Sequence, residues 1–142
     1  MTRAASCCFD SQPVGYGKSF AFPLRGGLNA PVEARQALLT RSTGMPASVR
    51  DDVLLLVTEL VTNAVRHAGV GPERSLETEV REWPGWVRVE VTDPSTGATS
   101  FGARSDGDGK GGWGLFLVDQ IADRWGVRRT PTGTCVWFEL SV

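Results

Sequence analysis

The segment Val49–Ala68 constrains the fold of this chain most, because it contains no glycine or proline until Gly69. Such an uninterrupted run predicts a long helix, with Ser48 as the candidate N-cap residue and Asp51 three positions later. The stretch Val53–Val57 is apolar nearly all round, as expected of a helix that is buried on most sides. The sequence therefore predicts a helix surrounded by other elements.

The second half of the chain contains patterns typical of strands. Val87, Val89 and Val91 alternate with Arg88 and Glu90, which predicts a strand with one buried face and one face in water. The predicted strands are Ser19–Leu24, Leu76–Trp83, Trp86–Thr92, Trp125–Arg129 and Thr134–Val142. The predicted helices are Val32–Arg41, Val49–Ala68 and Gly114–Arg124.

The resulting order, βααββαββ, predicts the fold class. Hairpins joined to helices indicate an α/β two-layer sandwich, with a mixed, mostly antiparallel sheet covered on one face by about three helices. Pro23 places the first strand at a sheet edge, because proline cannot donate to a neighbouring strand. We expect residues 1–17 to be a flexible tail and residues 18–142 to form one domain. The long segment Asp93–Gly112 between two elements indicates a functional loop.

Composition excludes several classes of protein. A net charge of -1 over 142 residues argues against direct nucleic-acid binding through many phosphate contacts. The three cysteines, Cys7, Cys8 and Cys135, form no CxxC pattern, so neither a zinc site nor a disulfide framework is indicated. No signal peptide or membrane-spanning run is recognisable, and we expect a cytoplasmic protein.

Three polar side chains follow the apolar part of the long helix. Glu59, Asn63 and His67 fall at i, i+4 and i+8, so they share one face with a drift of about 40° per step. A carboxamide oxygen suits a hard cation, and a carboxylate can accept a proton. The alternative is a solvated face near the helix end, with His67 favourable to the helix dipole.

Two further segments have features of a nucleotide site. Asp93 ends a strand before Pro94, so its carboxylate either accepts a hydrogen bond from an amine such as that of adenine or begins a turn. The run Gly107–Gly114 enters a helix, where glycine amides, the helix N-terminus and Lys110 suit phosphate oxygens. The alternative, a flexible linker, predicts more serine and no amphipathic helix directly afterwards.

The run Gly107–Gly114 also matches the dinucleotide fingerprint GxGxxG by letter. That fingerprint directly follows a strand in a βαβ unit, whereas the preceding strand here ends at Thr92. The P-loop pattern fails as well, because Lys110 is followed by Gly111 instead of serine or threonine. An NAD(P)-dependent oxidoreductase is therefore disfavoured.

In this order, the segments resemble the histidine-kinase-type ATPases, also called the Bergerat or GHKL group. ELVTNAVRHA resembles the N box, VTDPSTG the first glycine box, GGWGLFLVDQIADRWGV the second, and GTCVWFEL the final strand. The resemblance covers roughly Ser19 to Val142, and the short form is similar to the anti-sigma-factor serine kinases of bacteria. The only histidine, His67, lies in the N box, so we do not expect a complete sensor histidine kinase.

The resemblance implies a role for each matching residue. Asn63 would coordinate Mg²⁺ at the ATP phosphates, and Glu59 would be the general base for a serine hydroxyl. Asp93 would receive the adenine amino group, with Thr134 nearby through water. The other implied nucleotide contacts are Gly97 beside the base, Gly112, Gly114 and Leu115 at the phosphates, and His67 near the sugar. Ser95 departs from the family's first box, which commonly has glycine there.

These roles imply an ATP- and Mg²⁺-binding bacterial regulatory protein. It would be a serine/threonine kinase of the anti-sigma-factor type, which phosphorylates an anti-sigma antagonist and sequesters a sigma factor. The resemblance also implies a homodimer, and no contact with nucleic acid or a membrane is expected. The alternative is a nucleotide-gated protein-binding module without kinase activity.

Overall fold

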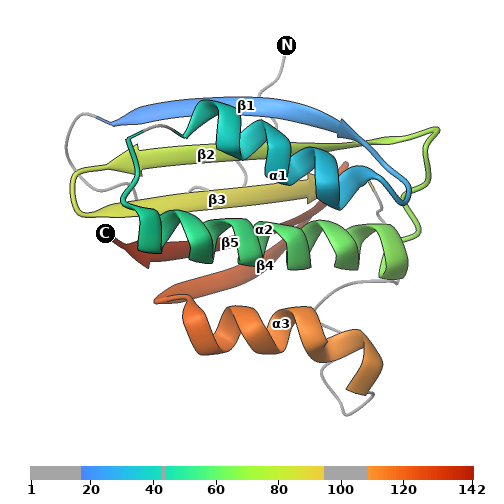
Figure 1. The fold of residues 1–142 in the computed structure, drawn as a ribbon. Coiled ribbons are helices and arrows are strands. Elements are labelled where there is room, and N and C mark those ends of the chain that lie inside the picture. Colours follow the sequence, from blue (N-terminus) through green and yellow to red (C-terminus); the bar gives the residue numbers. More distant parts are fainter. Residues whose placement is uncertain (1–16, 43, 95–108) are drawn as a thin grey trace.

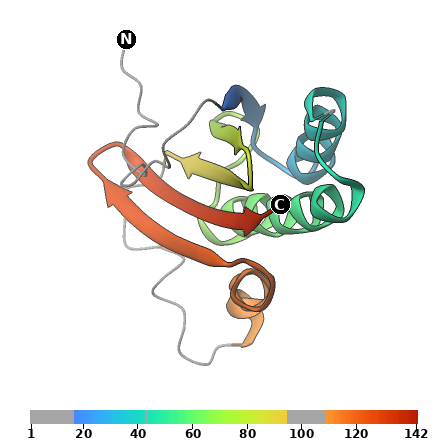
Figure 2. The same ribbon diagram turned by 90° about the vertical axis from the view of Figure 1, so that its left-hand side faces the viewer.

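The computed structural model describes residues 17–42, 44–94 and 109–142, and its elements follow the predicted order. One five-stranded sheet has the order β1-β2-β3-β5-β4, with each neighbouring pair antiparallel. Three helices cover one face of this sheet (Figures 1 and 2). The predicted two-layer α/β sandwich is confirmed. The elements are β1 (Lys18–Arg25), α1 (Ala30–Arg41), α2 (Ala47–His67), β2 (Ser75–Trp83), β3 (Trp86–Asp93), α3 (Gly109–Ile121), β4 (Arg124–Thr130) and β5 (Gly133–Ser141).

The apolar side of α2 forms the centre of the core. Leu56, Val57, Leu60 and Val61 are fully buried between α2 and the sheet, whereas Leu55 is 37% exposed. α1 and α3 flank this helix on either side (Figure 1). The prediction of a helix buried on most sides is thus confirmed. Among the described residues, no helix is both long enough and apolar enough to span a membrane.

Three local predictions had different outcomes. β1 is an edge strand, as Pro23 indicated. The prediction that Ser48 caps α2 is wrong: Pro46, with extended backbone (φ -57°, ψ 147°), precedes the helix, so Ser48 lies inside its first turn. The predicted bounds of the last helix, Gly114–Arg124, are wrong at both ends, because α3 begins at Gly109 and ends at Ile121. The helix ends before Arg124 because the backbone N–H of Asp123 donates a hydrogen bond to the carbonyl of Glu139 in β5.

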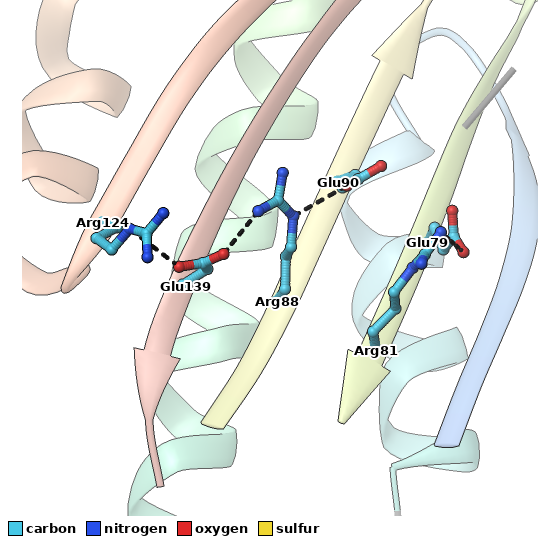
Figure 3. A network of polar contacts seen from close by, with 6 residues as sticks. All are labelled: Glu79, Arg81, Arg88, Glu90, Arg124 and Glu139. Atoms are coloured by element: carbon cyan, nitrogen blue, oxygen red, sulfur yellow. Dashed lines mark hydrogen bonds and ion pairs between the residues drawn. The ribbon is translucent and has the colours of Figure 1, made fainter. Parts of the chain in front are cut away.

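The sheet face opposite the helices, here called the helix-free face, carries buried charges. Arg88 and Glu90 of β3 are only 1% and 2% exposed, so the prediction of a face in water is wrong. These buried charges are balanced by ion pairs with neighbouring side chains instead of by water. Nε of Arg88 lies 3.0 Å from Glu90, and its Nη1 lies 2.6 Å from Glu139 of β5 (Figure 3). The Arg88 guanidinium also lies 4.1 Å from the ring centroid of Trp137.

Burial affects the pKa of one carboxylate on this face. Desolvation raises the pKa of Glu90 above the usual 4.5, although the neighbouring Arg88 opposes the shift. Oε1 of Glu90 is buried without a hydrogen-bond partner in the described part of the chain. The ionised form of Glu90 is therefore less favourable in the folded protein than in the unfolded chain.

The helix-free face also corrects the cysteine prediction. Cys135 of β5 is fully buried, and it pairs with Thr92 on this face. Its sulfur is part of a disulfide, so the expectation that the cysteines form none is wrong for this residue. Spacing alone concealed the bond, because a disulfide requires proximity in the fold and no particular spacing in the sequence.

We predict that Arg88→Met lowers the free energy of unfolding by about 3–5 kcal/mol, because it leaves Glu90 and Glu139 as buried carboxylates without this cation. Urea unfolding monitored by circular dichroism measures the loss. Arg124→Met is the matched control. The Arg124 side chain is 61% exposed, and its Nε lies 3.3 Å from Glu139. Substitution of this exposed residue should therefore lower the free energy of unfolding by less than about 1 kcal/mol. Equal costs would contradict the account.

We also predict a pH effect. A glutamate with a raised folded pKa contributes stability that is complete below its unfolded pKa and is lost as pH rises through the folded pKa. Relative to Glu90→Gln, the wild type should therefore lose free energy of unfolding as the pH rises above 4.5, the usual pKa of this carboxyl. Urea titrations across this range test the difference. Glu77→Gln, at an exposed position of β2, should retain the wild-type slope.

Candidate functional site

The predicted site residues lie on elements that meet at one end of the helix-covered side of the sheet. α2 ends there at His67, β3 ends at Asp93, and β5 and α3 both begin there (right-hand side of Figure 1). The antiparallel pairing of β3 with β5 causes this arrangement, since the end of one strand meets the beginning of the other. Residues far apart in the sequence are thereby gathered at one edge.

Asp93 and Thr134 are directly opposite one another in the β3–β5 pairing. They are 1% and 2% exposed. Alternation along the strands places them on the same face as Val91 and Val136, which is the face packed against the helices. The structure therefore brings together a buried carboxylate and a buried hydroxyl, the pair predicted from the sequence for the adenine end of the site.

Gly133 allows the backbone at the beginning of β5 to lie close to the backbone of Asp93. A Cβ at this position would overlap the carbonyl oxygen of Asp93 and would lie 3.3 Å from Cα of Pro94. The turn before it is held by Thr130, whose Oγ1 accepts a hydrogen bond from the Gly133 backbone N–H at 3.0 Å. No pattern in the sequence indicated that glycine is required at position 133. Its position directly before Thr134 was the available signal.

The polar residues of α2 differ in burial. Asn63 is 6% exposed, whereas Glu59 and His67 are half-buried. The solvated-face interpretation is therefore wrong for Asn63. Its Nδ2 is buried without a hydrogen-bond partner in the described part of the chain. A buried amide in that state requires a partner, because an unsatisfied polar group costs about 1–3 kcal/mol.

These residues fit the donor set of a nucleotide-bound Mg²⁺ ion. Mg²⁺ commonly takes one or two protein oxygens and completes its shell with phosphates and water. The described residues contain no group of three or more His, Cys, Asp or Glu side chains that could hold a metal by themselves. The amide of Asn63, with Glu59 one helical turn before it, is consistent with a cation held mainly by a bound phosphate.

The second glycine segment is already helical. α3 begins at Gly109, so Gly112, predicted as the end of the loop, lies in the first turn of the helix. Gly114, predicted as the first helical residue, lies in the second turn. Glycine's low helix propensity favoured the loop, and the backbone here adopts the helix nonetheless. The first four N–H groups of a helix, up to Gly112, lack partners within it and suit an anion. Leu115 is half-buried against the core.

Gly97 and Ser95, both in the first glycine box, lie outside the residues that the structure describes.

Arg74, in the turn before β2, is a residue that the sequence did not indicate. Its Nη2 donates a hydrogen bond to the carbonyl of Pro94 at 3.3 Å. This bond fixes the backbone immediately after Asp93. No pattern in the sequence identified it, because the two residues meet only through the strand pairing.

Comparisons with known proteins agree with this geometry. The family model described as "Histidine kinase-like ATPase domain" matches residues 29–140. A crystal structure of the RsbU and RsbW domains of Rv1364c from Mycobacterium tuberculosis is similar with a TM-score of 0.64 and 20% sequence identity. The match covers 87% of this chain and 31% of that chain, so this chain spans about a third of the protein it resembles. A search of curated proteins found no match.

We predict that Gly133→Ala weakens ATP binding about tenfold or more, because the new methyl group must displace the Asp93 backbone from its position opposite Thr134. Isothermal titration calorimetry with ATP and Mg²⁺ measures the change. Gly44→Ala is the matched control, since the nearest atom to its Cβ would be the Lys18 ammonium at 3.6 Å. Wild-type affinity in a folded Gly133→Ala variant would contradict the role of this close approach.

Proposed function

The chain belongs to the histidine kinase-like ATPase family, and from this premise we propose that it binds ATP with Mg²⁺ and acts as an anti-sigma-type regulatory kinase. The observation that carries the proposal is the buried, unsatisfied amide of Asn63 on the α2 face that also carries Glu59. A ligand oxygen, such as a phosphate oxygen, would give the Nδ2 of Asn63 an acceptor. The arrangement of Asp93 and Thr134 at the same end of the fold supports a purine as part of that ligand.

Each residue then has a distinct task in binding. Asp93 accepts the adenine amino group, with the hydroxyl of Thr134 beside it, and burial of both strengthens these hydrogen bonds. The glycine-rich beginning of α3, with Gly112, Gly114 and Leu115, holds phosphate oxygens. His67, at the C-terminal end of α2, borders the sugar and phosphates. Gly97 is assigned to the base by its place in the first glycine box.

In the reaction, Glu59 accepts the proton of the attacking hydroxyl. Glu59 is half-buried on α2, so it remains partly accessible to a protein substrate, and Asn63 one turn later would hold the cation by its amide oxygen. Mg²⁺ bound there would neutralise the charge that develops on the transferred phosphoryl group. The chain's own contribution is therefore to position the two reacting oxygens and to remove one proton.

The partners follow from the resemblance of the sequence boxes to anti-sigma-factor kinases. The proposed substrate is a serine or threonine of an antagonist protein, and the proposed regulated partner is a sigma factor. A homodimer in the cytoplasm is part of the same proposal. A nucleotide-gated binding module remains the second candidate, and the two differ only in whether a phosphoryl group is transferred.

We predict that Glu59→Gln lowers phosphoryl transfer about 100-fold or more while ATP affinity stays within about twofold to threefold. Transfer is measured from γ-labelled ATP to the antagonist-type protein that copurifies with the chain, and affinity by calorimetry. Asn63→Ala, one turn away, is the contrasting variant, because it should remove the Mg²⁺ dependence of ATP binding itself.

The outcomes separate the two candidates. Transfer by Glu59→Gln at the wild-type rate would refute its role as the base. If the wild type binds ATP and the partner but transfers nothing, the binding-module function is correct. If the wild type binds no ATP in the presence of Mg²⁺, both candidate functions are wrong.

A further inference from the structure

Arg74 directly precedes β2 and makes hydrogen bonds to three different parts of the fold. Its backbone N–H donates to the carbonyl of Gly71 at 3.1 Å, within the turn that leaves α2. Its backbone carbonyl accepts a hydrogen bond at 2.9 Å from the N–H of Gly26, in the loop after β1. Its side chain extends to the residue after β3, where Nη2 donates to the carbonyl of Pro94 at 3.3 Å. Arg74 therefore joins the connections that follow β1, α2 and β3.

The bond to Pro94 holds the chain just past the end of β3. The described pairing of β2 with β3 ends where Glu77 lies opposite Thr92, one residue before Asp93. On its other side, β3 stays paired with β5 as far as Asp93. Within the described residues, the guanidinium of Arg74 thus holds the backbone on the β2 side, where the strand pairing has already ended.

The turn that carries Arg74 is itself attached to α2. The backbone N–H of Val70 donates to the carbonyl of Ala64 at 3.4 Å, and Ala64 directly follows Asn63 in the helix. The loop after β1 packs closely onto the same turn, since a Cβ on Gly26 would overlap the carbonyl oxygen of Val70. Backbone contacts therefore fix the position of Arg74 relative to the helix that carries Asn63.

We propose that Arg74 is a positioning residue for the nucleotide base, an inference that rests on the function proposed above. Through Pro94 it holds Asp93 where the carboxylate can accept the amino group at C6 of adenine. The contacts from Asn63 through the turn to Arg74, and from Pro94 to Asp93, set the separation between the cation end and the base end of the site. Arg74 acts through the backbone and needs no contact with the nucleotide.

The chemistry of this bond determines the size of the expected effect. A hydrogen bond from a guanidinium to a carbonyl is charge-assisted, but this bond is exposed, so water competes for both groups. Asp93, in contrast, is only 1% exposed. A buried acceptor that faces the carbonyl oxygen of inosine instead of the amino group of adenine is left unpaired, which penalises binding. The wild type should therefore bind ATP at least about tenfold more tightly than inosine triphosphate.

The test compares ATP, inosine triphosphate and inorganic tripolyphosphate, each with Mg²⁺, by isothermal titration calorimetry of the full chain. In Arg74→Met, the preference for ATP over inosine triphosphate should fall about fivefold or more, while tripolyphosphate affinity stays within about twofold of the wild type. Arg74→Lys keeps a cationic donor and should retain most of the preference. Arg25→Met is the matched control, because it removes an exposed arginine from the end of the neighbouring strand β1 and should leave the preference unchanged.

A failure of this inference is distinguishable from a failure of the proposed function. Wild-type preference in Arg74→Met, or an equal loss in Arg74→Met and Arg25→Met, would overturn the role of Arg74 and leave the nucleotide site intact. A proportional loss of affinity for all three ligands would mean that Arg74 only stabilises the fold, which also overturns it. If the wild type binds ATP and inosine triphosphate equally, or binds neither, the assignment of Asp93 to the base is wrong, and the role of Arg74 is wrong with it.

Discussion

The pairing of β3 with β5 determines both functional regions of this fold. Its register places Asp93 opposite Thr134 on the helix-covered side and Arg88 opposite Glu139 on the other side. Because successive side chains of a strand point to opposite faces, a slip of one residue would turn both pairs to the wrong side. β5 follows β4 in the sequence but lies between β3 and β4 in the sheet, so neither region exists before β5 is paired.

The parts of the fold that were predictable from the sequence depend on local patterns. Short stretches of sequence were enough to predict the length of α2, the alternation in β3 and the edge position of the strand that contains Pro23. The order of helices and strands was predicted from such local patterns. The candidate site was found from Asn63, Asp93 and Thr134 because their segments matched a family. Strand pairing places Asp93 opposite Thr134 and brings the end of β3 to the end of the fold where α2 also ends.

What could not be predicted depends on contacts across the sheet. Alternation of valine with Arg88 and Glu90 resembles a strand with one face in water, and only the position of Glu139 on β5 reveals compensated buried charge. The requirement for Gly133 likewise arises from the Asp93 backbone opposite it. Propensity was misleading at the beginning of α3, where glycines adopt helical backbone within a helix that also carries Leu115 of the core.

The two faces support one another through the strands they share. The Arg88–Glu139 ion pair joins β3 and β5 close to their ends furthest from Asp93, so it holds the register without contributing an atom to the site. At the other end, Cys135 directly follows Thr134 and points to the opposite face. A covalent bond at Cys135 therefore fixes the backbone on which Thr134 depends. The disulfide sulfur of Cys135 and the hydroxyl of Thr134 therefore belong to adjacent residues of β5 on opposite faces of the sheet.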